Sequence, residues 1–437
     1  MRLVGRARVT IDILPDDVLL EIFDFCVAQA NLINPDNRWQ RLVHVCRKWR
    51  YVIFESPRRL NLQLVCSGRV PVRETLDVWP LLPIIVHRIG HAKYSTLGLD
   101  NVVAALERND RIRQITLMPF IDNSPQWERL LEAMQEPFPA LTNLFLYGVK
   151  PAPAIPDSFL GGSAPHLQIL LLEHILFPGL SKFLLSATHL VYLFLWSIPH
   201  SGYISPEAMA TCLSVLIRLD TLNLGFESPR SRPNGEIRRL PRPTRSVLPA
   251  LIRLDFKGTS EYLEDLVSRI DAPRLDCLDI KFFNQLIFDT PQLIQFITRT
   301  PELKVYDRAY VYFSYLDVSV TFPRTPSDSN DDFKLTISCR QSEWQLSAMA
   351  QVCSSSFPQS LIHKVERLYI REDGYSTLKW QDDFEDSQWL ELLRPFTGVK
   401  YLHLSDKLAP RIASSLQELV VRRTTEVLPA LESLYLD

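Results

Sequence analysis

The sequence contains little glycine, 14 of its 437 residues, against a usual share of about 7%. Enzymes that hold phosphate groups on glycine-rich loops need glycine at fixed spacings. The Walker A, Gly-x-Gly-x-x-Gly and Gly-x-Ser-x-Gly motifs are all absent. An excess of one charge is lacking too, because 48 Lys and Arg face 50 Asp and Glu, for a net charge of -2. No chain-wide basic field exists to attract nucleic acid. We therefore expect neither a phosphate-loop enzyme nor a nucleic-acid-binding protein.

Long hydrophobic runs are also missing. None approaches the ~18 residues that span a bilayer, and the longest candidate, 167–180, is interrupted by Glu173, His174 and Pro178. The N-terminal arginines have no apolar stretch behind them, so they do not form a secretory signal. The seven cysteines include no Cys-x-x-Cys pair, which is typical of reduced, buried thiols. We expect a protein of the cytoplasm or nucleus that does not bind membranes.

Residues 15–26 have the pattern of an amphipathic helix. Pro15 suits the first helical position, and the two aspartates after it suit the positive end of the helix dipole. Apolar residues then recur at helical spacing, at Val18, Leu19, Ile22, Phe23 and Cys26. A second stripe of this kind runs from Trp39 to Ile53 and ends before Pro57.

Two short helices cannot enclose much of a core, because about 60 residues are only marginally stable alone. Their large apolar side chains either bind a partner protein or cap the domain that follows. The pattern leaves both readings open.

The two ends of this segment resemble the F-box. Leu14-Pro15-x-x-Val18-Leu19-x-x-Ile22-Phe23 is similar to the family's Leu-Pro-x-Glu-Ile-Leu-x-x-Ile-Phe, and Val45-Cys46-Arg47-x-Trp49 to its Val-Cys-(Arg/Lys)-x-Trp. Asp17 stands where the family has Glu, and the connection over residues 27–38 is longer than usual. The resemblance covers about residues 12–56, and the segment looks like the large F-box families of mushroom-forming fungi.

An F-box implies a three-helix module that docks on a Skp-type adaptor, which is itself bound to a cullin and a RING subunit. The resemblance assigns adaptor binding to Leu14, Pro15, Val18, Leu19, Ile22, Phe23, Val45, Cys46 and Trp49. Some of these must hold the helices together instead, and the sequence does not divide them.

Leucine is abundant, and much of it lies in a repeated pattern, (Pro)-x-Leu-x-x-Leu-x-Leu. Clear copies occupy residues 139–146, 165–172, 188–195, 217–224, 249–256, 273–280, 397–404 and 429–436. Looser copies begin at Ile112 and Val365, and a poor one at Leu303. The interval between copies is nearly constant, except for one gap about twice as long between Leu303 and Val365, which we interpret as two units. Such recurrence indicates a solenoid.

Helix-like stretches lie between the copies, for example at 180–186, 206–216 and 344–353. This alternation resembles the leucine-rich repeat, which implies an α/β fold with a parallel sheet and outer helices. We expect an F-box at 1–60, a linker or N-terminal cap at 61–99, and a repeat domain that binds the substrate at 100–437. The asparagine that usually follows the last leucine is missing, so the solenoid should be irregular.

Alternate side chains of each repeat strand should face away from the helices, on the concave side of the sheet. The candidates for binding a protein substrate there are Phe145, Tyr147, Phe194, Trp196, Asp255, Lys257, Asp279 and Lys281. Glu173, Tyr369, Arg371, His403 and Tyr435 are expected on the same face. Large aromatic residues on an exposed sheet bind partners. The alternative is that a loop, or the segment around 79–86, covers them.

Other features point to no chemistry. His87 and His91 have the spacing of a metal pair, but no third ligand follows, so we expect no metal or cofactor. The arginine-rich stretch 227–245 and the acidic run 382–386 are interpreted as solvated loops. The sequence contains no recognisable set of a nucleophile, a base and an oxyanion donor, so we do not expect an enzyme. The chain ends directly after an expected strand, and we expect either a continuation or a covering surface there.

Together these patterns predict the substrate-recognition subunit of a Skp–cullin–F-box ubiquitin ligase. Its helices would dock on the adaptor and its repeats would bind a target that the sequence does not identify. The alternative is a non-catalytic repeat scaffold for protein–protein interaction, independent of any ligase.

Overall fold

The structure is a computed structural model. It describes residues 14–28, 38–57, 59–60, 62–67, 72–88, 96–118, 124–150, 154–229, 245–304, 306–324, 333–339, 341–372, 386–422 and 427–436. The chain divides into two compact units, unit 1 (Met1–Leu167) and unit 2 (Gln168–Asp437). No helix of the described residues is long and apolar enough to span a bilayer.

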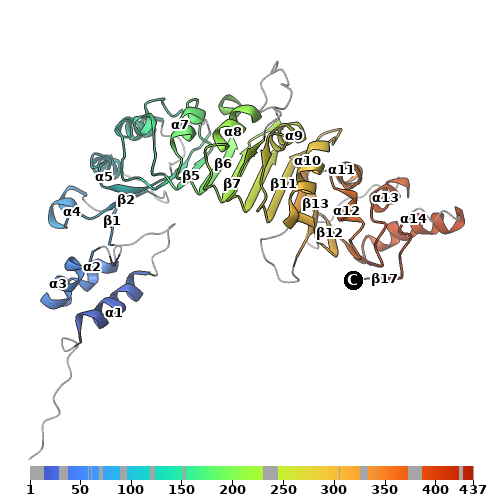
Figure 1. The fold of residues 1–437 in the computed structure, drawn as a ribbon, viewed down its shortest axis with the longest axis horizontal. Helices are drawn as coiled ribbons and strands as arrows, with labels where there is room; N and C mark the ends of the chain where they lie inside the picture. Colours follow the sequence, from blue (N-terminus) through green and yellow to red (C-terminus); the bar gives the residue numbers. More distant parts are fainter. Residues whose placement is uncertain are drawn as a thin grey trace, which may run out of the picture. The chain divides into compact units, whose positions relative to one another are not determined.

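Unit 1 opens with three helices, α1 (Asp16–Ala28), α2 (Arg38–Leu42) and α3 (Arg47–Glu55) (Figure 1). Helix α1 has Asp16 and Asp17 in its first turn, as the sequence predicts, but it begins directly after Pro15, which was expected to be its first residue. The expected second stripe is split between α2 and α3. Cys46 ends the turn between them, and its Sγ accepts the N–H of Trp49 at 3.5 Å as the N-cap of α3.

The rest of unit 1 alternates strands and helices. Its four strands lie in the order β1-β2-β3-β4, and every neighbouring pair is parallel. The elements are β1 (Leu64–Cys66), α4 (Val72–Val78), β2 (Ile84–Arg88), α5 (Thr96–Leu106), β3 (Ile112–Leu117), α6 (Ser124–Ala133), β4 (Asn143–Tyr147) and the short 3-10 helix η2 (Phe159–Gly162). Residues 61–99 therefore contain two strands of the sheet, which begins well before residue 100.

The three helices share one apolar core with the start of this sheet. That core includes Phe23, Trp49 and Ile53 from the helices, Leu64 from β1, and Leu82, which precedes β2. Trp39 joins the two parts: its indole N–H donates to the carbonyl oxygen of Gln63 at 2.8 Å, and its ring packs edge-on against Trp79 at 5.1 Å. Trp79 therefore packs against the helical segment, and Val86 is buried in β2.

Unit 2 contains a larger sheet. Its strands lie in the order β5-β6-β7-β9-β11-β14-β13-β12-β15-β16-β17. They are β5 (Ile169–Glu173), β6 (Tyr192–Ile198), β7 (Thr221–Phe226), β9 (Arg253–Gly258), β11 (Cys277–Phe283), β12 (Arg308–Phe313), β13 (Asp317–Phe322), β14 (Phe333–Ser338), β15 (Arg367–Glu372), β16 (Tyr401–Leu404) and β17 (Ser433–Leu436). Strands β8 (Ser246–Val247) and β10 (Ile270–Asp271) form a separate parallel pair.

The helices of unit 2 follow its strands along the chain. They are α7 (Leu180–Ser186), α8 (Pro206–Leu213), α9 (Ser260–Val267), α10 (Pro291–Arg299), α11 (Ser342–Ser355), α12 (Gln359–Ile362), α13 (Asp386–Leu393) and α14 (Ala409–Arg422), with short 3-10 helices η3 (His200–Gly202) and η5 (Pro301–Lys304). Helices α7 to α11 lie along one side of the strands (Figure 1). Side chains alternate accordingly: Leu254 and Phe256 of β9 are buried, whereas Asp255 and Lys257 between them are half-buried. We call the side opposite the helices the open face.

The long gap in the repeat, between Leu303 and Val365, does not hold two further parallel units. Strand β13 is antiparallel to both β12 and β14, so these three strands form an inserted meander. Strand β14 then pairs in parallel with β11, and β12 with β15. The poor copy at Leu303 lies in η5, and the strand begins only at Arg308. Antiparallel strands need only a short turn, here Ser314 to Leu316, whereas a parallel neighbour needs a crossover.

Glu264 joins two successive repeats. It lies in α9 with 3% of its surface exposed, and its carboxylate accepts the N–H groups of Gln292 at 2.9 Å and Leu293 at 2.7 Å. These donors are in the first turn of α10, where backbone N–H groups have no partner within the helix. The side chain of Thr290, the N-cap residue of α10, makes no capping bond to this helix and donates to Ser355 and Ser356 instead. Glu264 therefore caps the next helix from outside.

We expect Glu264→Ala to lower the free energy of unfolding by about 2 kcal/mol. Two hydrogen bonds to a charged group are lost, and two buried N–H groups lose their acceptor. Urea denaturation followed by circular dichroism measures the change. Glu261→Ala, at an exposed position of α9, is the matched control and should shift stability by less than about 0.5 kcal/mol. Equal shifts for the two variants would contradict the capping role.

The described cysteines are all free thiols. Five are buried, and Cys26 and Cys46 are half-buried. Burial raises the pKa of Cys66 and of Cys212 to about 11, which keeps these thiols protonated at neutral pH. The sequence-based expectation of buried thiols agrees with the five buried cysteines, whereas Cys26 and Cys46 are more exposed than expected.

Candidate functional site

Helix α1 carries two adjacent apolar stripes. One consists of Leu19 and Phe23, which are fully buried in the core that unit 1 shares. The other consists of Val18, Ile22 and Phe25, which are 42%, 37% and 71% exposed. Positions i, i+4 and i+7 lie on one side of a helix, so these three side chains form a single line. We call them the α1 stripe.

The structure thus divides the nine residues that the resemblance assigns to adaptor binding. Leu19, Phe23 and Trp49 are buried and hold the helices together, and the rings of Phe23 and Trp49 meet edge-on at 4.8 Å. These three are not accessible as a contact surface. Leu14 and Cys46 are half-buried, and Pro15, Val18, Ile22 and Val45 are exposed. Phe25, the most exposed residue of the α1 stripe, is an addition that the sequence pattern missed.

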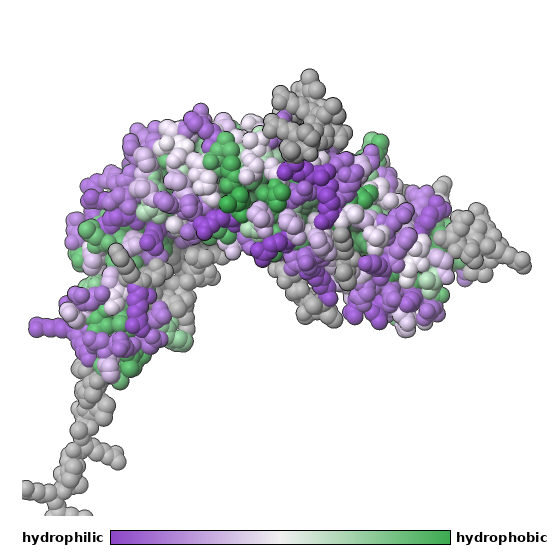
Figure 2. Space-filling model, in the orientation of Figure 1, coloured by the Kyte–Doolittle hydropathy of each residue, from purple (hydrophilic) through white to green (hydrophobic). Residues whose placement is uncertain are grey.

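Charged groups frame the α1 stripe and hold α1 in place. The ammonium of Lys48 donates to the carbonyl oxygen of Leu14 at 2.7 Å and lies 3.4 Å from the carboxylate of Asp16. Arg59 donates to Glu21 at 2.6 Å. Figure 2 shows apolar atoms among hydrophilic ones on the surface of this helical segment. An apolar line with a charged border is the anatomy of a protein-binding surface.

A second candidate surface is the open face of unit 2. The strand register places Phe194, Asn223, Asp255 and Asp279 side by side in one row, from β6 to β11. The next row, two residues further along each strand, contains Lys257 and Lys281. The ring of Trp196 of β6 lies beside Lys257, with the ammonium 5.6 Å from its centroid. With Trp196, six of the eight predicted substrate-binding residues are neighbours on this face. Phe145 and Tyr147 are half-buried on β4 of unit 1, beside the buried Leu144 and Leu146.

The open face also carries an aromatic stack that sequence reasoning found only in part. The rings of Tyr310, Tyr369, His403 and Tyr435 follow one another across β12, β15, β16 and β17, with centroids 4.4, 4.3 and 4.5 Å apart. Tyr369, His403 and Tyr435 were expected on this face because they occupy the same position in three copies. Tyr310 was missed because it belongs to the inserted meander. The signal available in the sequence was its position between two apolar residues, Ala309 and Val311, which are both buried in the structure.

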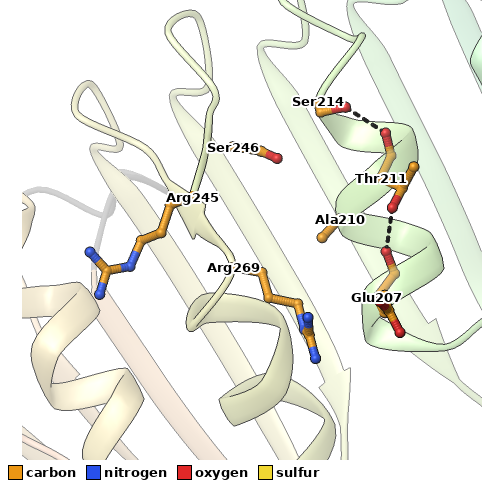
Figure 3. Close-up of a pocket in the computed structure, with 7 residues that line it drawn as sticks. All are labelled: Glu207, Ala210, Thr211, Ser214, Arg245, Ser246 and Arg269. Carbon is orange, nitrogen blue, oxygen red and sulfur yellow. Dashed lines mark hydrogen bonds between the residues drawn. The ribbon is translucent and has the colours of Figure 1, made fainter. Parts of the chain in front are cut away.

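The described residues also form a shallow pocket between α8 and the β8/β10 pair (Figure 3). Its volume is about 150 Å³, below the range of about 300–1,000 Å³ that is usual for small-molecule sites. Thr211 and Ser214 donate their hydroxyls to carbonyls of α8, and Arg245 and Arg269 point in different directions. Nothing in this pocket pairs a nucleophile with a base.

The described residues contain no group of three or more His, Cys, Asp or Glu side chains that could hold a metal ion. His87 is half-buried on β2, where burial lowers its pKa, and His91 lies outside the described residues. Most of the arginine-rich stretch 227–245 and the acidic residues at 382–385 also lie outside them.

Comparisons with known proteins add little. No protein family and no curated protein matches the sequence. Among solved structures, the chain is similar to the leucine-rich repeat-containing protein LegL7 from Legionella pneumophila, at 11% identity and a TM-score of 0.28, over 86% of this chain and 89% of that one. A TM-score this low does not establish a shared fold. The repeated strand–helix order and the mostly parallel sheet are themselves consistent with a leucine-rich-repeat-like solenoid.

Proposed function

We propose that this chain is the substrate-recognition subunit of a Skp–cullin–F-box ubiquitin ligase in the cytoplasm or nucleus. The observation that carries the proposal is the exposure of Val18, Ile22 and Phe25 directly after the Leu14-Pro15 motif. A line of large, exposed apolar side chains lowers the solubility of a protein unless a partner covers it. In the family that the motif resembles, that partner is a Skp-type adaptor.

In this proposal the chain performs no bond chemistry itself. The α1 stripe, with Pro15 and Val45, binds the adaptor and thereby a cullin–RING core. The open face of unit 2 binds the target protein. Holding both raises the effective concentration of a target lysine near the ubiquitin-conjugating enzyme.

Co-expression of the full chain with a Skp-type adaptor tests the first step. We expect a stable complex on size-exclusion chromatography, which then takes up a cullin–RING core added in purified form. A chain that elutes without the adaptor would overturn the proposal.

A second candidate function is a repeat scaffold that works without a ligase. It is favoured by the core that α1 to α3 share with β1 and β2, which is what a cap of the sheet requires. An adaptor complex that does not take up the cullin would favour this scaffold over the ligase subunit.

A further inference from the structure

Two like-charged pairs lie side by side on the open face of unit 2. Asp255 of β9 is in register with Asp279 of β11, and Lys257 is in register with Lys281. Neighbouring strands are about 4.8 Å apart, and like charges directly opposite each other destabilise a sheet. Exchanging one Asp with one Lys would give two attractive pairs instead. These two pairs therefore oppose the stability of the sheet, whereas Lys334 of β14, in register with Asp279 on its other side, places an opposite charge beside one of them.

Two of these four side chains each form an ion pair within the protein. The guanidinium Nε of Arg253 donates to both carboxylate oxygens of Asp255, at 2.9 and 3.0 Å. The ammonium of Lys281 donates to Asp317 at 2.8 Å. Lys257 and Asp279 form neither a hydrogen bond nor an ion pair through their side chains with any described residue. On its other side Asp279 is in register with Lys334 of β14, whose positive charge partly offsets the effect of burial on the pKa of Asp279. Of the four charges, Lys257 and Asp279 are the two that form no direct ion pair with a described residue and that an external group can contact.

Burial makes these two charges costly. Burial raises the pKa of Asp279 above its ordinary value. It lowers the pKa of Lys257, and the charge of the nearby Lys281 lowers that pKa further. A counter-charge supplied from outside would relieve both effects.

Aromatic rings hold the lysine in position. The ammonium of Lys257 lies 5.6 Å from the centroid of the Trp196 ring and 5.8 Å from that of Phe283. Trp196 lies over Gly225, where an added Cβ would come within 2.7 Å of the indole. Ser197, next to Trp196, has a φ of 52°, and the register of β6 shifts there. Such bulges re-aim a side chain. The glycine and the bulge together fix the ring beside Lys257.

We propose that this surface binds an extended segment of a target protein in which an acidic and a basic side chain are two residues apart. The acidic group would contact Lys257 between the two rings, and the basic group would contact Asp279. Lys257 and Asp279 are diagonal neighbours on adjacent strands, about 7–8 Å apart, which is close to the ~7 Å between side chains i and i+2 on one side of an extended peptide. This inference rests on the proposed function only in assigning target binding to unit 2.

An array of synthetic peptides with a Gly-Ser background tests it with the full chain. The peptides carry Glu and Arg in both orders and at separations of one to four residues, together with Glu-x-Glu and Arg-x-Arg. We expect the wild type to bind peptides with one of the two orders of Glu and Arg when these residues are two positions apart. Its affinity for these peptides should be about tenfold higher than for peptides in which the two residues are adjacent.

Variants should change the preference predictably. Lys257→Glu should favour Arg-x-Arg, Asp279→Lys should favour Glu-x-Glu, and the double variant should favour the opposite order of Glu and Arg. Lys182→Glu, at an exposed position of α7, is the matched control and should bind like the wild type. A flat array, or a preference that does not follow the charges, would overturn the inference.

Adaptor binding, measured separately, distinguishes this inference from the proposed function. Peptide selectivity without adaptor binding would support this surface and overturn the ligase assignment. Adaptor binding with a flat array would overturn this surface alone.

Discussion

The double variant Ile22→Asp and Phe25→Asp should bind a Skp-type adaptor about a thousandfold more weakly than the wild type. A central apolar anchor of an interface is worth about 2 kcal/mol or more, which is roughly a 30-fold change in affinity, and the α1 stripe would lose two. Both side chains are exposed, so the midpoint of thermal unfolding should not change. Isothermal titration calorimetry with the purified adaptor measures the affinity.

Leu286→Asp and Ile287→Asp make the matched control. These residues are 72% and 74% exposed in unit 2, so the change in surface chemistry is the same at a different place. Adaptor affinity should be retained there. If both double variants bind like the wild type, the α1 stripe is not the adaptor surface.

A second large effect is expected for Trp39→Ala, which should destabilise unit 1 by about 4 kcal/mol. The indole is 2% exposed, packs against Phe54 and Trp79, and donates to the carbonyl of Gln63. Truncation of a buried tryptophan leaves a cavity and, here, also removes the hydrogen bond to Gln63. Because the same core contains Leu64, we expect α3 and β1 to lose protection together in hydrogen exchange.

Trp344→Ala is the control for this variant, since Trp344 is 44% exposed on α11, and it should change stability by less than about 1 kcal/mol. Exchange that increases in α3 but not in β1 would show that the three helices fold independently of the sheet.

The sequence predicts that α1 is apolar, but it does not predict which of its apolar residues are buried and which are exposed. Leu19 and Phe23 follow Val18 and Ile22 directly, and neighbouring residues on a helix differ by only about 100° in direction. Which pair is buried depends on the side from which α3 approaches, and that is a tertiary contact. Phe25 escaped notice because Asp24 precedes it and the family motif ends at Phe23.

The repeat shows a similar limit. Leucine spacing predicts the parallel strands well, because each copy must bury the same face against the next. The meander does not follow that spacing. Its own signal was a period of two, in the alternation Val318, Val320 and Phe322. An expectation of repeats concealed it.

The meander also bears on how unit 2 acquires its structure. Phe313 pairs with Val318, its near neighbour in the sequence, whereas Arg308 pairs with Arg367, which lies far along the chain. Contacts between residues close in sequence form first, since little chain entropy is lost when a short loop closes. A hairpin of this size closes within about 1–10 μs. The middle of unit 2 can thus order early and serve as a nucleus from which the flanking repeats propagate in both directions.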